Sequence, residues 1–589
     1  MQTAVIKKNR AVREEEKKFI PVETMMNDMN HLEQYAQTVI NYTSKYNISF
    51  SISYAPENLV GKCAKYPLYG DFAETYILRS YGTWWKESEA YQKEYMPLEE
   101  DPLGAEDYVT LGFEHPVVPR DVCIYETFNP GAVVRIWGRF TDLDWKLLWE
   151  GPPQECPEGA RKFHPTIRNL NCLINEIRIE FNQSHLKYHT SIDAVLLGGY
   201  EPKQVLQQHI LQKDLLKWTP EVVSKDGETW DDKCDLFSRL PHEVVVHIFQ
   251  YLDLCTLGRC AQVNNQWNAV TKDPILYQNL TLKRYWHKIN GKTLYILADR
   301  CRYVRKLDLS WCGNDDKSFT QAFLEFFPKC YQQLTHISVC HCDFVNNDVI
   351  LKFSMCHDLT ELRLRNTKVD NNGFQQLARL RKLVTLDLCS TLITDEPLIS
   401  ILKANAGLKH LLLDFCESLE RLDLVVETVA NCNKEITTWS SFKTTTMTAI
   451  GGLHFASCAN LKELDLGWCF PFAHPGDCLE KIAKNCRNLT RLIISQWRDV
   501  NDYMLLPITL YCKNLAQLDL LGIKSITRDI CERLLASLPS LRLLDISFCN
   551  AINHHQVMIW RRQYPHVTIQ RSCEYTVTEY ISVVLRELP

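Results

Sequence analysis

Nine times in the second half of the chain, apolar residues recur in the pattern L-x-x-L-x-L-x-x-C/N/T or a close variant of it. The first apolar positions of these units are Val304, Leu334, Leu359, Leu383, Leu408, Leu461, Leu489, Leu515 and Leu541. Neighbouring units begin 24 to 26 residues apart from Leu334 to Leu408 and again from Leu489 to Leu541. A period of this length indicates one small unit of structure whose copies bury each other's apolar faces.

The period falls in the range of leucine-rich repeats. Each unit is predicted to be a short strand followed by a helix, with parallel strands on a concave inner surface and helices outside. The 53 residues that separate Leu408 from Leu461 leave room for two units, so one unit lacks its leucines. We place its leucine positions at Glu435, Thr438 and Ser440 and expect an irregular coil there, because polar side chains fill a core poorly.

The positions of the 24 cysteines favour a role in the core. Many end the pattern of a unit, and others stand three residues before a first apolar position: Cys301, Cys356, Cys432, Cys458, Cys486 and Cys512. Buried thiols of this kind act as small hydrophobes. The one tight Cys/His cluster, Cys340-His341-Cys342, matches no common zinc-binding spacing. We therefore expect no metal, no cofactor and no catalytic residue.

Charge and hydropathy exclude two classes of protein. The chain carries 66 basic and 71 acidic residues, a net charge of −5, whereas a nucleic-acid binder needs a concentrated basic surface. A membrane-spanning helix is not predicted, because no apolar run reaches about 18 residues. Residues 1–18 include Glu14, Glu15 and Glu16 and lack an apolar segment, so neither a secretory signal nor a mitochondrial presequence is expected.

The first 200 residues have a different pattern. Apolar and polar residues alternate in 108–113 and 177–181, which is typical of half-buried strands, and prolines interrupt them at turn-like intervals. An antiparallel β-sandwich is therefore predicted over about 50–200. A tail and a helix are predicted over 1–49, the helix spanning Met29–Tyr46, and a polar connector over 201–235.

Residues 240–274 combine helix signals with apolar spacing. Pro241 stands at a helix start, where its missing N–H costs nothing, and Glu243 complements the positive end of the helix dipole. One apolar stripe at helical spacing is predicted from Val244, Ile248, Phe249 and Leu252. Further short helices are predicted over about 255–263 and around Trp267. Three such helices have too little core to stand alone, so they need the repeats or a partner.

This segment resembles the F-box, with its leucine-proline-x-glutamate start and its later aliphatic residues and tryptophan. An arbitrary amphipathic linker would not fix so many residue types. The resemblance implies a domain over 236–282 that binds a Skp-type adaptor. The residues expected to bind it are Leu240, Pro241, Glu243, Val244, Ile248, Phe249, Leu252, Leu257, Val263 and Trp267.

With leucine-rich repeats over 283–571 and a tail over 572–589, the chain resembles the F-box/leucine-rich-repeat family. Segments 81–85, 129–136 and 193–197 are similar to the discoidin-like, or galactose-binding-like, N-terminal domain of a family member. The predicted fold class is therefore multidomain: an antiparallel β-sandwich, a three-helix F-box and an α/β leucine-rich-repeat solenoid.

The resemblance implies a non-catalytic substrate receptor of a Skp–cullin–F-box ubiquitin ligase, with the adaptor, and through it a cullin, as partners. It further implies a part in mitochondrial quality control, with mitochondrial autophagy receptors as substrates and a metal-dependent protein phosphatase as a partner. The expected location is intracellular: cytoplasmic, at the mitochondrial outer surface or nuclear.

Between the last two apolar positions of each unit stands a residue that is expected to face the concave surface. Aspartates recur there with aromatic neighbours, which together could hold a basic or amphipathic peptide. The expected substrate-binding residues are Asp308, Trp311, Arg363, Asp387, Phe415, Asp465, Trp468, Asp519, Asp545 and Phe548. The alternative is that the aspartates are only solvated and the aromatic residues cap the coil edges.

Two other functions remain open. An extracellular adhesion protein could combine a sandwich with repeats, and Asn-x-Ser/Thr tripeptides begin at Asn41, Asn47, Asn182, Asn279 and Asn488. An F-box protein could also act outside any ligase, as a scaffold.

Overall fold

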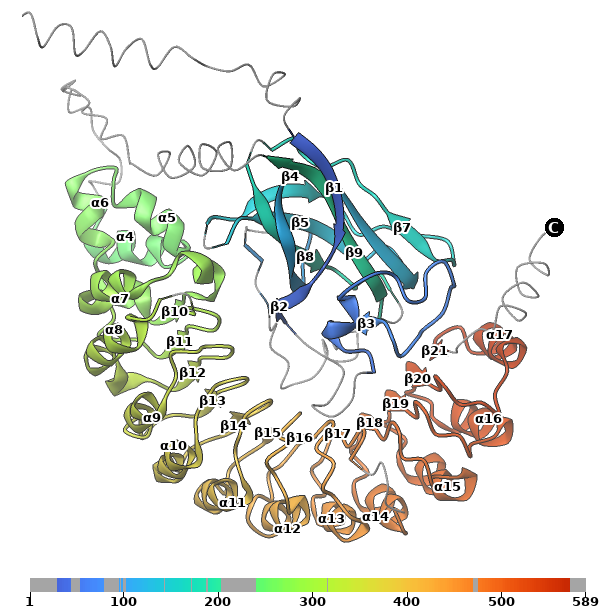
Figure 1. Ribbon diagram of the computed structural model, residues 1–589. Helices are drawn as coiled ribbons and strands as arrows, with labels where there is room; N and C mark the ends of the chain where they lie inside the picture. Colours follow the sequence, from blue (N-terminus) through green and yellow to red (C-terminus); the bar gives the residue numbers. More distant parts are fainter. Residues whose placement is uncertain are drawn as a thin grey trace, which may run out of the picture. The chain divides into compact units, whose positions relative to one another are not determined.

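The computed structural model describes residues 29–43, 53–78, 95, 97–98, 102–141, 143–170, 172–186, 189–202, 240–314, 316–469 and 475–572. They divide into two compact units (Figure 1). The described residues of the N-terminal part form a β-domain, and the second unit contains 240–572 together with Tyr95, Pro97 and Leu98. The predicted tails, most of the predicted connector and the segment 81–85 lie outside the described residues.

The β-domain is an antiparallel sheet region, as predicted. Its elements are β1 (Met29–Tyr35), β2 (Thr38–Tyr42), η1 (Pro56–Leu59), β3 (Tyr76–Ile77), β4 (Asp107–Phe128), β5 (Val133–Arg139), β6 (Lys146–Glu150), β7 (Arg161–Phe163), β8 (Ile174–Phe181) and β9 (Ser191–Pro202). The long strand β4 pairs with β2 and β8 in its first half and with β7 and β9 in its second half. One core joins Val109 and Ile177 from the first set of strands to Ile124 and Val195 from the second, so it lies between the two halves of the sheet.

The helix predicted over Met29–Tyr46 is wrong. Residues 29–42 form the two strands β1 and β2 instead, and these pair with β9 and β4 respectively. Leu32, Ala36 and Val39 do face the core, but they do so from extended backbone. Apolar spacing over so short a stretch fits both periods, and pairing with distant strands decides between them.

The segment 129–136 that suggested a family resemblance contains a tight turn between β4 and β5. Gly131 has a φ of +113°, and a Cβ there would lie 2.1 Å from the carbonyl oxygen of Gln154. The Gly131 N–H donates to Oε1 of Glu126 (3.0 Å), whose side chain is fully buried. Glycine is therefore required at this turn by its backbone conformation and by the close approach of the chain.

Glu126→Gln is expected to remove a pH dependence from the stability of the β-domain. Burial raises the pKa of Glu126 to about 7, although the Gly131 N–H and the Arg161 guanidinium lower it. Because this folded-state pKa exceeds the unfolded value of about 4.3, the contribution to stability is complete below about pH 4 and is lost as the pH rises towards 7. Chemical denaturation from pH 4.5 to 7.5 should show that the free energy of unfolding falls by about 3 kcal/mol more in the wild type than in the variant. Equal slopes in the two proteins would contradict this assignment.

From residue 240 onward, the second unit consists of three short helices followed by a repeat region. The leading elements are α4 (His242–Phe249), α5 (Leu254–Cys260), α6 (Asn265–Val270), η3 (Pro274–Tyr277), β10 (Asn279–Thr281) and η4 (Lys283–Lys288). The side chain of Leu276 packs against both the core of the three helices and the core of the repeats. β10 then pairs with β11, the first strand of the predicted repeats, so the helices run into the repeats without an intervening gap in packing.

In the described part of the chain, twelve parallel strands follow one another in sequence order, each paired with the next (Figure 1). After β10 they are β11 (Lys306–Asp308), β12 (His336–Ser338), β13 (Glu361–Arg363), β14 (Thr385–Asp387), β15 (His410–Leu412), β16 (Thr438–Ser440), β17 (Glu463–Asp465), β18 (Arg491–Ile493), β19 (Gln517–Asp519), β20 (Leu543–Asp545) and β21 (Thr568–Gln570).

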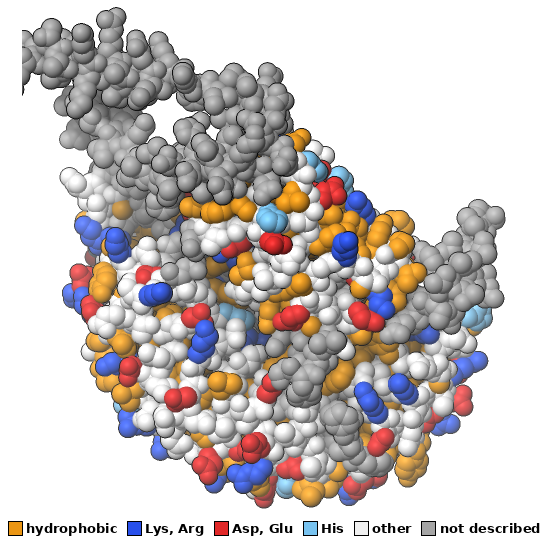
Figure 2. All heavy atoms as spheres, viewed as in Figure 1, with side chains coloured by type: hydrophobic (Ala, Val, Ile, Leu, Met, Phe, Trp, Pro, Cys, Tyr) orange, Lys and Arg blue, Asp and Glu red, His pale blue; other side chains and the backbone are white. Residues whose placement is uncertain are grey.

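Helices cover the outer side of these strands (Figure 1). They are α7 (Gly291–Leu297), η5 (Ala298–Arg300), α8 (Phe319–Phe326), η6 (Phe327–Lys329), η7 (Tyr331–Gln333), α9 (Asn347–Phe353), α10 (Asn371–Gln376), η8 (Leu377–Arg379), α11 (Asp395–Ala404), α12 (Leu422–Cys432), α13 (Ala449–His454), η9 (Phe455–Ser457), α14 (Cys478–Asn485), α15 (Asp502–Tyr511), α16 (Arg528–Ser537) and α17 (His554–Gln563). Within the described residues, no helix has the length and apolar character to cross a membrane. Acidic and basic side chains are interspersed over the face shown in Figure 2, in keeping with the near balance of charge.

The irregular coil predicted near residue 435 is wrong. β16 pairs regularly with both neighbours, and Trp439 lies between Leu411 and Leu464 in the leucine column. Trp439 is completely buried, and its indole N–H donates to Oγ of Ser441 (2.8 Å). The predicted register was one residue early, because a tryptophan and a buried serine stand where the pattern has leucines.

The same shift corrects one member of the cysteine column. Asn433, not Cys432, takes the place before this coil, and its Nδ2 donates to the carbonyl oxygens of Leu402 (3.1 Å) and Asn405 (2.6 Å). The other five predicted column members are buried, as expected: Cys301, Cys356, Cys458, Cys486 and Cys512. Four of the cysteines that end the pattern, Cys342, Cys416, Cys469 and Cys549, donate to a carbonyl of the preceding coil, as when the thiol of Cys416 donates to the Leu388 carbonyl (3.1 Å).

A left-handed backbone conformation recurs just after the inner strands. It is adopted by Trp311, His341, Asn366, Ser390, Phe415, Lys443, Trp468, Gln496, Gly522 and Phe548. Each donates its backbone N–H to a carbonyl that follows the next strand, as Ser390 does to Asp414 (2.7 Å). We refer to these residues as the coil-edge column. Most of them are not glycine, so the hydrogen-bond ladder is made at the expense of backbone strain.

Ser390→Gly is expected to stabilise the repeat region by about 0.5–1 kcal/mol, because Ser390 is exposed and has a φ of 56°. The free energy of unfolding from a denaturant titration measures the effect. Ser400→Gly is the matched control within helix α11, where the same substitution should destabilise by about 0.5 kcal/mol. Destabilisation of similar size at both positions would show that residue 390 carries no strain.

Candidate functional site

Polar side chains cap two of the three short helices that precede the repeats, α5 and α6. A carboxylate oxygen of Asp253 accepts the N–H of Thr256 (2.6 Å) at the start of α5, which together with the Thr256 hydroxyl holds the pKa of Asp253 below its usual value. Asn264 accepts the N–H of Trp267 (2.8 Å) at the start of α6. These caps satisfy helix N–H groups that have no partner within the helix.

The helices enclose a small core of their own. Its buried members are Val245, Val246, Phe249, Leu257, Cys260 and Val270, with Leu252, Trp267 and Leu276 packed against them. The rings of Phe249 and Trp267 meet edge to face, with centroids 5.3 Å apart. This core fixes which side of α4 points outwards.

The outward side of α4 is also apolar. Val244, Ile248 and Tyr251 are 43%, 37% and 80% exposed and stand at i, i+4 and i+7, so they lie on one face. Leu240, Val263 and Ile275 are further exposed apolar residues of this region. We call these six residues the exposed apolar strip.

The single predicted stripe is therefore wrong in one respect. Val244 and Ile248 face outwards, whereas Phe249 is buried and Leu252 packs against the inner core. Because a helix turns about 100° per residue, Val244 and Phe249 lie about 140° apart around the axis. The helix has two apolar faces, and the pattern alone merged them.

The residues predicted to bind an adaptor fall into two groups. Leu240, Pro241, Glu243, Val244, Ile248 and Val263 are exposed, and direct contact with a partner stays a prediction for them. Phe249 and Leu257 are buried, and Leu252 and Trp267 are partly buried within the inner core. Their contribution to binding would be to position the exposed group.

In the repeats, the predicted concave residues form one row across the sheet. The row runs through Asp308, Ser338, Arg363, Asp387, Leu412, Ser440, Asp465, Ile493, Asp519, Asp545 and Gln570, each paired with the next. The leucines before them lie in the core, so the row faces the opposite, inner side of the strands. The structure thus brings six of the predicted substrate-binding residues into one line.

Many of these aspartates also hold the backbone. A carboxylate oxygen of each of Asp308, Asp387, Asp465, Asp519 and Asp545 accepts the N–H two residues further on, at 2.8–3.1 Å. Such a bond turns the chain at the end of the strand. All of these except Asp308 are buried. Their recurrence is therefore accounted for at least in part by structure, and a role in binding stays a prediction.

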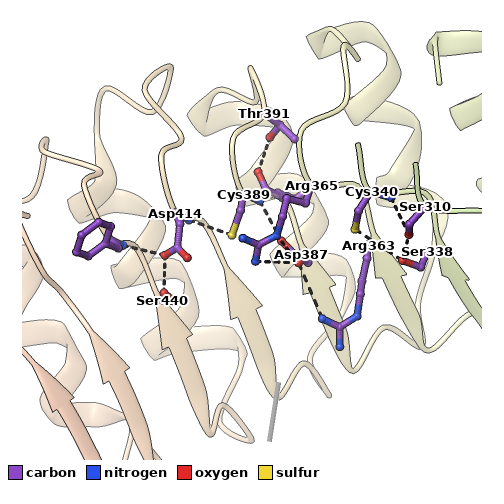
Figure 3. Close-up of polar contacts among 12 residues, drawn as sticks. Ser310, Ser338, Cys340, Arg363, Arg365, Asp387, Cys389, Thr391, Asp414 and Ser440 are labelled. Carbon is purple, nitrogen blue, oxygen red and sulfur yellow. Dashed lines mark hydrogen bonds and ion pairs between the residues drawn. The ribbon is translucent and has the colours of Figure 1, made fainter. Parts of the chain in front are cut away.

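Charges on the central strands neutralise one another (Figure 3). Nε of Arg363 donates to Glu361 (2.6 Å), and Nε and Nη2 of Arg365 both donate to Oδ2 of Asp387 (3.2 Å each). Nη1 of Arg363 also lies 3.9 Å from that oxygen. On the next strands, Asp414 accepts both the Ser440 hydroxyl and the N–H of Phe442.

Further along the row, two carboxyl groups are direct neighbours. Asp519 and Asp545 are paired on β19 and β20, and both are buried. Burial, and then the charge of Asp545, raise the pKa of Asp519 well above its usual value. Asp519 therefore loses its proton at a higher pH than an exposed aspartate does.

The predicted aromatic residues all belong to the coil-edge column. Trp311 stacks flat on His341, with centroids 4.0 Å apart and rings 10° from parallel. Burial, followed by the nearby charges of Arg365 and Lys283, lowers the pKa of His341 well below 6.5, so this imidazole is neutral.

A second aromatic group surrounds a lysine. Nζ of Lys443 lies 5.9, 5.5 and 4.9 Å from the ring centroids of Phe415, Phe442 and Trp468. The structure thereby brings together two predicted residues, Phe415 and Trp468. Phe548 is half-buried at the far end of the column.

The buried cysteines of the repeats are poor nucleophiles. Burial raises the pKa of Cys340 to about 11 and those of Cys301 and Cys416 to about 12. A thiol with such a pKa is protonated at neutral pH. Among the described residues, no three His, Cys, Asp or Glu side chains are grouped so as to hold a metal ion.

Comparison with known proteins now gives the family. The F-box-like family model matches residues 237–283, which contain the three short helices α4, α5 and α6. F-box/LRR-repeat protein 4 from Bos taurus is 32% identical over 574 residues, which cover 92% of this chain and 91% of that protein. The chain belongs to the F-box/LRR-repeat family.

A structural comparison adds little to this. The crystal structure of the Rad7 and Elc1 complex in yeast aligns with 62% of this chain and 92% of its own chain, at 18% identity and a TM-score of 0.34.

In this F-box/LRR-repeat protein, the sequence interpretation missed several residues of the two candidate surfaces. Tyr251 is the most exposed member of the apolar strip, and its i+7 spacing from Val244 was the signal that could have found it. His341 and Lys443 occupy the same place in their coils as Trp311 and Trp468, so repeat alignment alone could have identified them. Arg365 follows a leucine position and carries no such signal.

Proposed function

We propose that this chain is the substrate-recognition subunit of a Skp–cullin–F-box ubiquitin ligase. The observation that carries the proposal is the exposed apolar strip on the F-box helices. Isolated exposed apolar residues are ordinary on a protein surface, but several of them on one short helical segment, beside a small core, mark an interaction site. In a segment matched by the F-box-like family model, the partner that this strip fits is a Skp-type adaptor, and through it a cullin.

The chain would act by proximity and perform no bond chemistry itself. The adaptor would hold the F-box near a charged conjugating enzyme, while the repeats and the β-domain would hold the target. The gain is in effective concentration and orientation of a target lysine. The raised thiol pKa values support a non-catalytic role for the repeat cysteines.

The finer assignments extend the family resemblance. We propose a discoidin-like β-sandwich for the N-terminal domain, supported by one core between two sets of strands, and a leucine-rich-repeat solenoid for the twelve-stranded region. A role in mitochondrial quality control, with autophagy receptors as substrates and a metal-dependent phosphatase as partner, belongs to the same proposal. Abundance of these candidate proteins on mitochondria, compared in cells with and without the chain, tests that role.

The adhesion alternative meets an obstacle at one of its sequons. Asn182 is buried, and its Nδ2 donates to the carbonyl oxygen of Leu103 (2.7 Å), so a glycan there would break this contact. A mass shift on glycosidase treatment of the native protein would nevertheless decide for secretion.

Affinity purification of the wild type beside a Leu240→Ala/Pro241→Ala variant tests the ligase proposal. Both residues are exposed at the start of α4, so the variant should fold. The expected result is that adaptor and cullin are lost together while other partners remain. Retention of adaptor without cullin in the wild type would favour the scaffold alternative, and absence of adaptor from the wild type would overturn the proposal.

A further inference from the structure

Three described residues that precede β4 in the sequence pack with the repeats. Tyr95, Pro97 and Leu98 belong to the compact unit of 240–572, although β3 before them and β4 after them belong to the β-domain. All three are buried, with Tyr95 fully inaccessible and Leu98 4% exposed. Burial of a tyrosine, a proline and a leucine so close together indicates a docked peptide segment.

Tyr95 docks on the aromatic start of the coil-edge column. Its ring meets that of Trp311 edge to face, with centroids 6.2 Å apart and rings 81° apart. Trp311 in turn stacks on His341 and lies 6.3 Å from the ring of Trp286. Edge-to-face and stacked pairs of this kind add specificity to the burial of area.

Space remains beside this contact. A cavity of about 190 Å³ is lined by Trp311 and by Trp286, His287, Lys288, Asn314 and Asp316 among others. This is smaller than the usual site for a cofactor or drug-sized molecule and suits a single side chain. Trp311 thus has the chain's own Tyr95 against it and also borders an opening.

We propose that the Trp311–His341 surface is a docking site for an extended peptide in which an aromatic residue is followed within three positions by proline and an aliphatic residue, and that Tyr95, Pro97 and Leu98 occupy it in cis. The inference rests on the proposed function: a target that carries such a peptide competes with the chain's own segment for the surface. A tethered segment acts at millimolar effective concentration, so a target displaces it either through additional contacts or at a comparable concentration. Proline favours the extended form, since it fixes φ and removes an N–H.

A fluorescein-labelled peptide with the sequence of residues 91–100 tests this in the full chain bound to its adaptor. Fluorescence anisotropy should show binding to a Tyr95→Ala/Leu98→Ala variant that is about tenfold or more tighter than binding to the wild type, in which the site is filled. A peptide with alanine at the position of Tyr95 is the matched control and should not bind. Adding Trp311→Ala to the double variant should abolish binding. Equal binding by wild type and double variant would overturn the inference.

A second measurement uses the wild type alone and does not depend on the variants folding. Excess unlabelled peptide should raise amide hydrogen exchange in residues 91–100, and the alanine peptide should not. Unchanged exchange at millimolar peptide would also overturn the inference. Adaptor binding, measured in the same samples, separates the two proposals. If the adaptor binds and the peptide has no effect, only the docking site is contradicted. If the adaptor does not bind, the ligase assignment is contradicted.

Discussion

Binding of the Skp-type adaptor is expected to weaken by about 100-fold or more when Val244 and Ile248 are both replaced by glutamate. Both side chains are exposed on one face of α4 and contribute nothing to the inner core. Burial of one such aliphatic side chain in an interface is worth about 1.5–3 kcal/mol, and a carboxylate placed there must also lose its hydration. A loss of about 2.8 kcal/mol already corresponds to 100-fold.

Titration calorimetry with purified adaptor measures this effect. Ile450→Glu/Leu510→Glu is the matched control, because these residues are about as apolar and even more exposed, on the outer helices α13 and α15. Adaptor affinity should stay unchanged in the control, and thermal unfolding should move little in either variant. If both double variants bind the adaptor like the wild type, α4 does not form the interface.

Trp439→Ala is expected to lower the free energy of unfolding of the repeat region by about 3–5 kcal/mol. Trp439 is completely buried between two leucine positions, its ring meets that of Phe455 edge to face at 5.1 Å, and its N–H is bonded to Ser441. Truncation leaves a cavity in a close-packed core and also leaves the serine hydroxyl without its donor.

Denaturant titration followed by circular dichroism measures the loss. Trp468→Ala, at the half-buried coil edge, is the control and should cost less. The register assumed from sequence, with Thr438 and Ser440 in leucine positions, predicts instead that Trp439 faces outwards and that its truncation is nearly neutral. A change in the free energy of unfolding of less than about 0.5 kcal/mol would therefore support that register instead.

Prediction from sequence succeeded where a residue's neighbours lie one repeat away. Leu383, Leu386 and Leu388 belong to a repeated pattern, so their core positions can be inferred by comparison with the other repeats. All three are buried as expected. The prediction for the coil that contains β16 was wrong because two of its core positions hold Trp439 and Ser441, whereas the repeat pattern has leucines there. The core accommodates the larger side chain of Trp439, and its indole N–H donates a hydrogen bond to Ser441 that a sequence pattern cannot show.

Prediction failed where partners are distant. β1 and β2 have apolar spacing that suits a helix, but they pair with β9 and β4, which lie more than 60 residues further along the chain. The candidate site shows the same division. A motif located the F-box, yet the exposed side of α4 depended on which of its two apolar faces the inner core would take. Tyr95 packs against Trp311, which lies in a distant part of the sequence, and the local sequence around neither residue indicates this contact.

The shared side chain of Leu276 has a mechanical consequence. Because it packs against both the F-box core and the repeat core, and because β10 pairs directly with β11, the two parts are joined by packing as well as by the chain. A target bound to the repeats would then lie at a defined distance and angle from a partner bound to the F-box. The positions of the target's lysines relative to the F-box would then decide which of them is modified. A target whose lysine is relocated by mutation could avoid modification without losing affinity for the repeats.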